Sequence, residues 1–291
     1  MLQRGPHRSA LAKKAVRQLR QETADKITHK YVLMVKWGDI KTNITTTFKI
    51  SPVSMIPHKS KPYRCILGLS FALFNKGVKF ASVNYKTTKI SLPEAMAQLG
   101  FVLKHIIHKI AQYLHHGLHI KFTKLDVKDG FWRMAVSDED AWNFYYVLPS
   151  LQTTTNIDYI EIVVPNRLQT GWCDNSPFLC SGSETAGDLM EKVRKIDLPP
   201  HEFEHYMMQK IDPLGTTVDN EVLVTLLEVY FDDFIAMRNN TSHAHLLQVS
   251  RAMLNGIHAI FPPPEVTSYN GFDPVALSKL EKVEGTWEQI K

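Results

Sequence analysis

The stretch VLVTLLEVYFDDFIAMR at residues 222–238 constrains the fold of this chain more than any other. Two apolar, β-rich runs flank an adjacent pair of carboxylates, Asp232 and Asp233. Such a pattern predicts an antiparallel hairpin with the acidic pair at its turn. A carboxylate pair among apolar and aromatic neighbours is costly unless a cation compensates its charge. We therefore expect an antiparallel sheet with an acidic tip.

A third carboxylate, Asp126, ends another strand-like run, KFTKLD at residues 121–126. Strand ends of one sheet can bring the three carboxylates together, and divalent cations such as Mg²⁺ relieve the resulting repulsion. Two such ions about 3.5–4 Å apart clamp the attacking and leaving oxygens of a phosphoryl transfer. The alternative is an Asp-Asp turn held by its own backbone contacts, which the aromatic residues Tyr230, Phe231 and Phe234 disfavour.

Hydrophobic periodicity around this sheet predicts helices and further strands. Apolar residues at three- and four-residue spacing between Leu92 and Leu114 are typical of a helix. The segments WNFYYVL and YIEIVV, separated by a polar turn, predict a second hairpin. Further helices are expected at residues 9–30, 183–195 and 243–258, and extended segments at 31–37 and 45–53. Together these elements predict one α+β unit with subdomains.

Composition excludes several classes of protein. The 291 residues are 44% hydrophobic and 22% charged, which is typical of a globular protein with a sizeable core. The first 20 residues are too charged for a signal peptide, and no apolar stretch reaches about 18 residues, so no membrane partner is expected. The three cysteines are far apart and indicate no disulfide framework. An intracellular location, in the cytoplasm or nucleus, is the expectation.

Charge is unevenly distributed along the chain. Residues 1–133 contain 24 lysines and arginines and 6 aspartates and glutamates, whereas residues 134–291 contain 10 and 23. A basic half beside an acidic half favours a polyanion-binding surface on the first and a metal-binding surface on the second. Two solvated surfaces of opposite sign that pair with each other are the alternative.

Four motifs together resemble one enzyme family. The segments KLDVKDGFWRM (124–134), LQTGWCDNSPFLC (168–180) and VYFDDFI (229–235) resemble successive palm motifs of reverse transcriptases from retrotransposons and retrovirus-like elements. The segment KPYRCILGLS (61–70) resembles the fingers motif that precedes them. The resemblance covers about residues 45–291, and its specificity comes from four motifs in the right order.

The resemblance implies a fold and an activity. The fold would be an α+β fingers–palm polymerase core, with an antiparallel palm sheet backed by helices and no thumb. Residues 1–44 would form a basic helical extension, 45–122 the fingers and 123–291 the palm. The implied activity is RNA-directed DNA synthesis, in which dNTPs are added to a primer on an RNA or DNA template. The end, LSKLEKVEGTWEQIK, resembles the approach to a primer-gripping hairpin, so a fragment is expected. The alternative is a catalytically inactive remnant that keeps the fold and nucleic-acid binding.

The resemblance also assigns catalytic roles. Asp126 and Asp232 would hold two Mg²⁺ ions, with Mn²⁺ as a substitute, and Asp233 would be the third carboxylate. Lys61 and Arg64 would contact the triphosphate of the incoming nucleotide.

Four further residues would contact the nucleotide or the base pair. Asp129 and Gly130 would offer backbone N–H groups to the phosphates, and Gly171 would allow close approach to the base pair. Phe131 would be the sugar gate that blocks a 2′-hydroxyl, which favours deoxynucleotides; a packing role is the alternative.

Three positions depart from the family pattern. Gly68 stands where the fingers motif usually has an aspartate. Thr170 stands where many retroviral relatives have a glutamine, and one additional residue lies between Trp172 and Ser176.

Other motifs have simpler explanations. The segment HEFEH (201–205) matches H-E-x-x-H, a zinc-protease signature, with Glu221 or His243 as the only suggested third ligands. Pro199 and Pro200 precede it, so we expect the start of a surface helix instead. The histidines on and after the 92–114 helix are expected to be structural or electrostatic; they are His105, His108, His115, His116 and His119. The basic residues of the first helix either contact phosphates or face solvent.

Overall fold

The structure is a computed structural model that divides into two compact units along the chain. The N-terminal unit comprises residues 1–90 and 131–175, and the C-terminal unit comprises residues 91–130 and 176–291. The structure describes residues 1–44, 48–59, 61–88, 100–117, 120–151, 155–208, 225–239, 243–263, 273–281 and 288–290. The domain boundaries expected from the sequence, after residues 44 and 122, stay a prediction.

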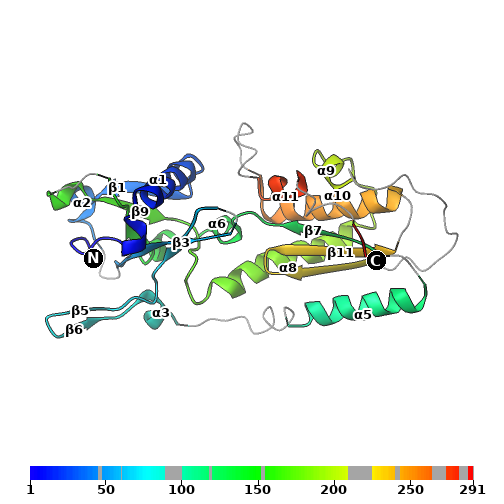
Figure 1. Ribbon diagram of the computed structural model, residues 1–291, viewed down its shortest axis with the longest axis horizontal. Coiled ribbons are helices and arrows are strands. Elements are labelled where there is room, and N and C mark those ends of the chain that lie inside the picture. Colours follow the sequence, from blue (N-terminus) through cyan, green and yellow to red (C-terminus); the bar gives the residue numbers. More distant parts are fainter. Residues whose placement is uncertain are drawn as a thin grey trace. The chain divides into compact units, whose positions relative to one another are not determined.

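The N-terminal unit combines short helices with three small sheets (Figure 1). One sheet has the order β1-β9-β8-β2, in which β2 and β8 are parallel and the other pairs antiparallel; β3-β4 and β5-β6 form two antiparallel hairpins. Its elements are η1 (Arg8–Ala10), α1 (Lys13–Thr28), β1 (Val32–Lys36), α2 (Trp37–Ile40), β2 (Ile50–Ser51), β3 (Val53–Pro57), β4 (Tyr63–Leu67), β5 (Leu73–Asn75), β6 (Val78–Phe80), α3 (Val83–Lys86), α7 (Asp138–Ala141), β8 (Tyr145–Val147), η2 (Ile157–Tyr159) and β9 (Glu161–Pro165). The short helix α6 (Gly130–Arg133) crosses the boundary between the units.

The first helix supplies one wall of the core in this unit. Ala15 and Leu19 of α1 are buried with residues of β1, β3, β4 and β9 in one cluster. Arg20, on the same helix, forms an ion pair with Glu161. Lys13 and Arg17 stay exposed, so both explanations of this basic helix remain predictions.

The C-terminal unit contains one antiparallel sheet with the order β10-β11-β7-β12. Alternating residues of neighbouring strands share a face, so Phe122, Leu226 and Met237 lie on the same side. The elements are α5 (Val102–His115), β7 (Ile120–Asp126), α8 (Asn175–Val193), which begins at the boundary between the units, α9 (Glu204–Met208), β10 (Thr225–Tyr230), β11 (Asp233–Asn239), α10 (His243–Ile260), α11 (Leu277–Glu281) and β12 (Glu288–Ile290).

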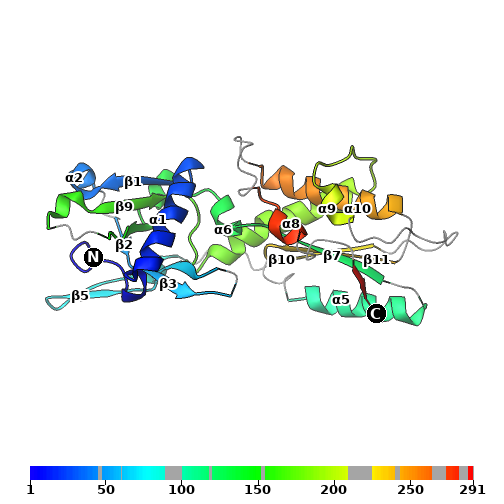
Figure 2. The ribbon, with the colours of Figure 1, turned by 45° about the horizontal axis from the view of Figure 1, so that its top comes forward.

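Helices cover both faces of this sheet. Figures 1 and 2 both show α5 on one side of the strands and α10 on the other. Tyr113 of α5 is buried in a cluster with Ile120 and Met237. On the opposite side, a Cβ added at Gly256 of α10 would lie 2.4 Å from Cγ of Met190, so α10 and α8 pack closely at this glycine.

Most expected elements are present. The mixed α+β class, both hairpins and the helices near residues 9–30 and 243–258 are confirmed. The helix expected at 183–195 begins earlier, at Asn175, because Pro177 is tolerated in a first helical turn. Of the segments expected at 45–53 and 92–114, residues 45–47 and 92–99 lie outside the described part. No helix among the described residues is long and apolar enough to cross a membrane.

Candidate metal and nucleotide site

Three carboxylates meet at one end of the C-terminal sheet. Asp233 opens β11 and pairs in register with Asp126, the last residue of β7. Asp232 lies in the turn between β10 and β11, and its carbonyl accepts a hydrogen bond from the Val127 N–H at 2.8 Å. Each of the three offers an oxygen, and these oxygens all lie within 4.8 Å of one another. The convergence expected from the sequence is therefore present.

The turn that carries Asp232 has unusual backbone geometry. Phe231 has a φ of 57°, in the left-handed region that bulky residues rarely adopt. The pair Tyr230–Asp233 closes the hairpin around Phe231 and Asp232. Backbone outliers of this kind cluster at functional sites, where the surrounding structure holds them.

A distant segment completes the site. Val275 bridges Val127, and the Ala276 N–H donates to the carbonyl of Asp126 at 3.2 Å. The helix α11 that follows brings Lys279 Nζ to 2.8 Å from Oδ2 of Asp126. On the other side, Lys124 Nζ lies 2.9 Å from Oδ2 of Asp233. Two lysines thus offset part of the negative charge of the three carboxylates.

Burial and mutual repulsion shift the pKa values of this cluster. Burial raises the pKa of Asp126 to about 6; the hydrogen bond and charge of Lys279 act in the opposite direction, and Asp232 and Asp233 raise it further. Burial also raises the pKa of Asp232, and the charge of Asp233 adds to this effect. Both acids therefore take up protons more readily than exposed aspartates do, because burial and the neighbouring carboxylates disfavour the charged form.

The donor set suits hard divalent cations. Carboxylate oxygens from three side chains, partly buried and close together, are the ligands that Mg²⁺ and Mn²⁺ prefer in proteins. The cost of gathering three negative charges would be offset by such ions. The residues present thus fit the kind of metal ion that the family resemblance implies.

Two expected nucleotide-binding residues lie in this same unit. Asp129 has a φ of 54°, a left-handed conformation that an aspartate tolerates better than most residues. Gly130 is buried, and a Cβ added to it would lie 3.2 Å from Leu179 and 3.5 Å from Cβ of Asp232. The glycine therefore lets the chain pass close to α8 beside the carboxylates. Their N–H contacts to phosphates stay a prediction.

The other expected nucleotide-binding residues belong to the N-terminal unit. Lys61 forms an ion pair with Glu22 of α1 at 3.1 Å. Arg64 lies on β4 and is exposed, and Phe131 is half-buried. Contacts of these residues with a nucleotide stay predictions.

Close packing explains two glycines of the N-terminal unit. Gly171 has a φ of 108°, and a Cβ at this position would lie 2.6 Å from the carbonyl oxygen of Leu67. Asn84 holds the same loop, because its side chain donates to the Gly171 carbonyl at 2.8 Å. At Gly68, a Cβ would lie 3.0 Å from two atoms of Pro52. An aspartate at position 68 would require Pro52 to move.

The HEFEH segment forms a hydrogen-bonded relay. Helix α9 begins only at Glu204, so the two histidines do not share a helical face, as the preceding prolines predicted. His201 Nδ1 accepts from the Phe203 N–H, and His201 Nε2 lies 3.1 Å from His258 Nδ1. His258 Nε2 in turn lies 2.9 Å from Asp273. The suggested zinc ligands Glu221 and His243 lie outside the side chains that are described.

The helical histidines have polar partners. His105 Nδ1 lies 2.9 Å from Glu228 Oε1 on β10, and His108 contacts Gln112 one turn later. Neither needs a metal ion to explain its place. His119 is outside the described residues.

Sequence reasoning did not identify the two lysines of the site. Lys124 lies two residues before Asp126 on the same strand face, a spacing that was available as a signal. Lys279 comes from a segment remote in sequence, and the sequence around it does not indicate its contact with Asp126.

Comparison with family models of known proteins gives no match for this chain, and comparison with curated protein sequences gives none either. The case for a function therefore depends on the motifs and the geometry.

Proposed function

We propose that this protein is an RNA-directed DNA polymerase, with the C-terminal sheet as its palm and the fingers in the N-terminal unit. The observation that carries the proposal is the convergence of Asp126, Asp232 and Asp233 at one sheet end. Carboxylates gathered in this way could hold the ions of a two-metal phosphoryl transfer. The four motifs add order and spacing to this geometry.

In the proposed reaction, the protein positions charge. Asp126 and Asp232 would hold two Mg²⁺ ions, and Asp233 would add the third carboxylate. When bound, these ions would lower the pKa of the primer 3′-hydroxyl and neutralise the departing pyrophosphate. Lys61 and Arg64 would bind the triphosphate, and the backbone of Asp129 and Gly130 would bind phosphate oxygens.

Primer extension on an RNA template in the presence of Mg²⁺ tests this function. Asp232→Asn keeps the size of the side chain but removes a charged ligand, so extension should be lost. Asp188→Asn, an exposed acid on α8, is the matched control and should extend as the wild type does. Wild-type extension by Asp232→Asn would refute the proposed role of the carboxylates.

Sugar selectivity tests the proposed gate. Phe131→Val should admit ribonucleotides that the wild type rejects, because a smaller side chain leaves room for a 2′-hydroxyl. The ratio of dNTP to rNTP incorporation is the measurement. An unchanged ratio would remove Phe131 from the mechanism and favour its packing role.

A second candidate is a polymerase-like remnant that binds nucleic acid without turnover. The observation that favours it is that Lys279 and Lys124 already pair with Asp126 and Asp233. Filter binding of a primer–template, scored beside extension products, separates the two functions. Retained binding without any extension by the wild-type protein would support the remnant.

A further inference from the structure

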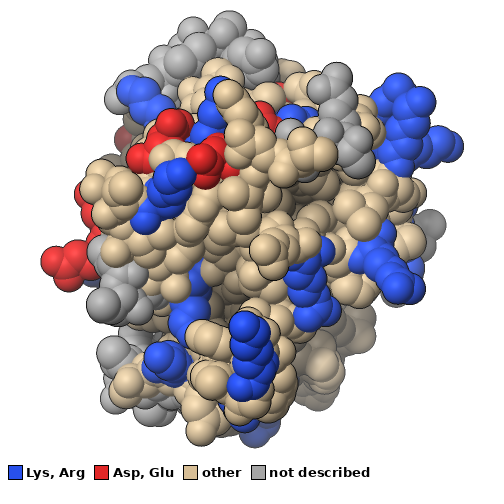
Figure 3. Space-filling view, turned by 90° about the vertical axis from the view of Figure 1, so that its left-hand side faces the viewer, with Lys and Arg blue, Asp and Glu red and all other residues tan. Residues whose placement is uncertain are grey.

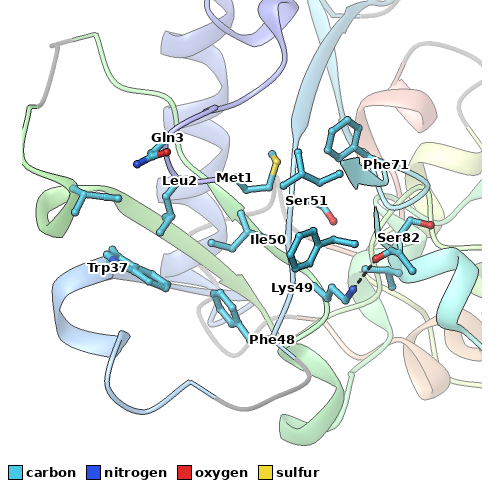
Figure 4. A pocket seen from close by; sticks show the side chains of 15 residues that line it. Met1, Leu2, Gln3, Trp37, Phe48, Lys49, Ile50, Ser51, Phe71 and Ser82 are labelled. Atoms are coloured by element: carbon cyan, nitrogen blue, oxygen red, sulfur yellow. Dashed lines mark hydrogen bonds between the residues drawn. The ribbon is translucent and has the colours of Figure 1, made fainter. Parts of the chain in front are cut away.

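The N-terminal unit contains a pocket outside the candidate polymerase site. Its volume is about 430 Å³, within the range of small-molecule sites. Four aromatic rings line it, from Trp37 of α2, Phe48, Phe71 and Phe80 of β6. Figure 4 shows Trp37, Phe48 and Phe71 around the same hollow, together with Lys49. The aromatic lining offers flat surfaces on which another ring can stack.

Positive charge accompanies these rings. Lys49 lines the pocket, and its Nζ donates to the carbonyl of Ala81 at 2.6 Å, which engages one of the three N–H bonds of an ammonium group. The guanidinium of Arg4 lies 4.3 Å from the ring centre of Phe71. Burial lowers the pKa of Lys49, and the nearby charge of Lys86 adds to this effect. A bound anion would stabilise the charged form of Lys49.

Negative charge is missing from the pocket wall. None of the described residues that line it is acidic. Figure 3 shows this end of the N-terminal unit, where lysines and arginines are spread over the visible surface and the acidic side chains lie toward its upper and left edges. The pocket thus combines an aromatic lining with one lysine, Lys49, and no acidic residue among the described residues of its wall.

We propose that this pocket binds a flat aromatic ring with an attached anionic group, in the form of a nucleotide that is free or part of a single strand. The base would stack against the aromatic rings, and its phosphate would contact Lys49 and Arg4. The site is separate from the three carboxylates, since all of its residues belong to the N-terminal unit. It goes beyond the proposed polymerase reaction and does not depend on it.

Binding of deoxyadenosine monophosphate to the full chain in EDTA tests the proposal, because no metal then assists the carboxylates. Deoxyadenosine has the ring without the charge, and inorganic phosphate has the charge without the ring; both should bind at least about tenfold more weakly. A short deoxyadenylate strand distinguishes a site for free nucleotides from a site for single strands. Tighter binding of the strand assigns the pocket to single strands, and equal binding assigns it to free nucleotides.

Variants locate the binding. Lys49→Met should weaken binding of the monophosphate about tenfold. Phe80→Ala should weaken it about fivefold or more through lost stacking, and this ring is 52% exposed, so its truncation spares the core. Lys195→Met, an exposed lysine of the C-terminal unit, is the matched control and should bind as the wild type does.

Three results would overturn the proposal. The first is the absence of saturable binding by the wild type, and the second is equal affinity for deoxyadenosine and its monophosphate. The third is full binding by folded Phe80→Ala and Lys49→Met combined with a loss in Lys61→Met, which would place the nucleotide at the expected triphosphate site instead. Circular dichroism establishes that each variant is folded.

Discussion

Asp233 lies directly opposite Asp126 in the register of β11 and β7, so two like charges face each other across neighbouring strands. Such a pair destabilises a sheet. Lys124 and Lys279 each compensate one member of the pair, at 2.9 and 2.8 Å. The sheet therefore tolerates two facing carboxylates at its tip, each with a lysine partner.

Removal of Lys279 should reveal the destabilising repulsion between Asp126 and Asp233. In EDTA near pH 8, we expect Lys279→Met to lower the free energy of unfolding by about 1 kcal/mol or less, because the lysine is partly exposed and its ion pair is screened. The same change should raise the pKa of Asp126, which Lys279 holds down. Urea denaturation measures the first effect and carboxyl NMR titration the second. Lys195→Met, an exposed lysine outside the cluster, should change neither; equal effects of both variants would contradict the argument.

Magnesium should stabilise the folded protein. At a free concentration ten times its dissociation constant, one bound ion adds about 1.4 kcal/mol. The midpoint of thermal unfolding should therefore rise with MgCl₂ but not with KCl at equal ionic strength. A variant with asparagine at positions 126, 232 and 233 should lose this response. If that variant responds as the wild type does, the ions bind elsewhere.

Gly171→Ala should be strongly destabilising. A Cβ at this position would lie 2.6 Å from the carbonyl oxygen of Leu67, and the φ of 108° adds backbone strain. We expect a loss of about 2 kcal/mol or more in urea denaturation. Gly77→Ala is the control, because Gly77 also has a positive φ, of 78°, but open space around its Cβ position. A comparable loss in both variants would show that φ alone, and not the Leu67 contact, sets the cost.

Acid should destabilise the relay around His201. Burial lowers the pKa of His201 to about 4, and His258 adds to this effect while Asp273 and Glu204 oppose it. Between about pH 6.5 and 4, the unfolded chain takes up a proton at this histidine that the folded chain does not. Stability from His201 is thus present above pH 6.5 and is lost as the pH falls toward 4.

The slope of stability against pH measures this effect. His201→Gln should be less stable at pH 7 because it breaks the relay, yet it should lose less stability on acidification. His108→Gln, on the exposed side of α5, should keep the wild-type slope. An identical slope in His201→Gln would show that another group takes up the proton.

The hairpins could be predicted because their signals are local. The β10–β11 turn is marked by apolar runs around Asp232, and the β8–β9 pair by a polar turn between two apolar segments. The position of Asp126 at the end of a strand predicted that it would lie near this turn. The same local reasoning placed the start of α9 after Pro200.

Long-range packing limited the remaining predictions. The contact of Lys279 with Asp126 depends on how a remote segment crosses the end of β7, which no local pattern encodes. In α5 the apolar stripe is divided: Val102 is buried, whereas Leu103 and Ile107 are exposed. Periodicity predicted the helix correctly over residues 102–114, but it does not say which apolar positions another element covers.

The peptide units around Asp126 have a consequence for the order of folding. Val127 donates to the carbonyl of Asp232, and Ala276 donates to that of Asp126. Two segments, 106 residues apart at Asp126 and Asp232, must therefore meet before the carboxylates lie together, and such non-local contacts form slowly. A nascent chain would carry its acidic residues as separate, solvated charges, and a cation-binding cluster would exist only once the sheet is closed.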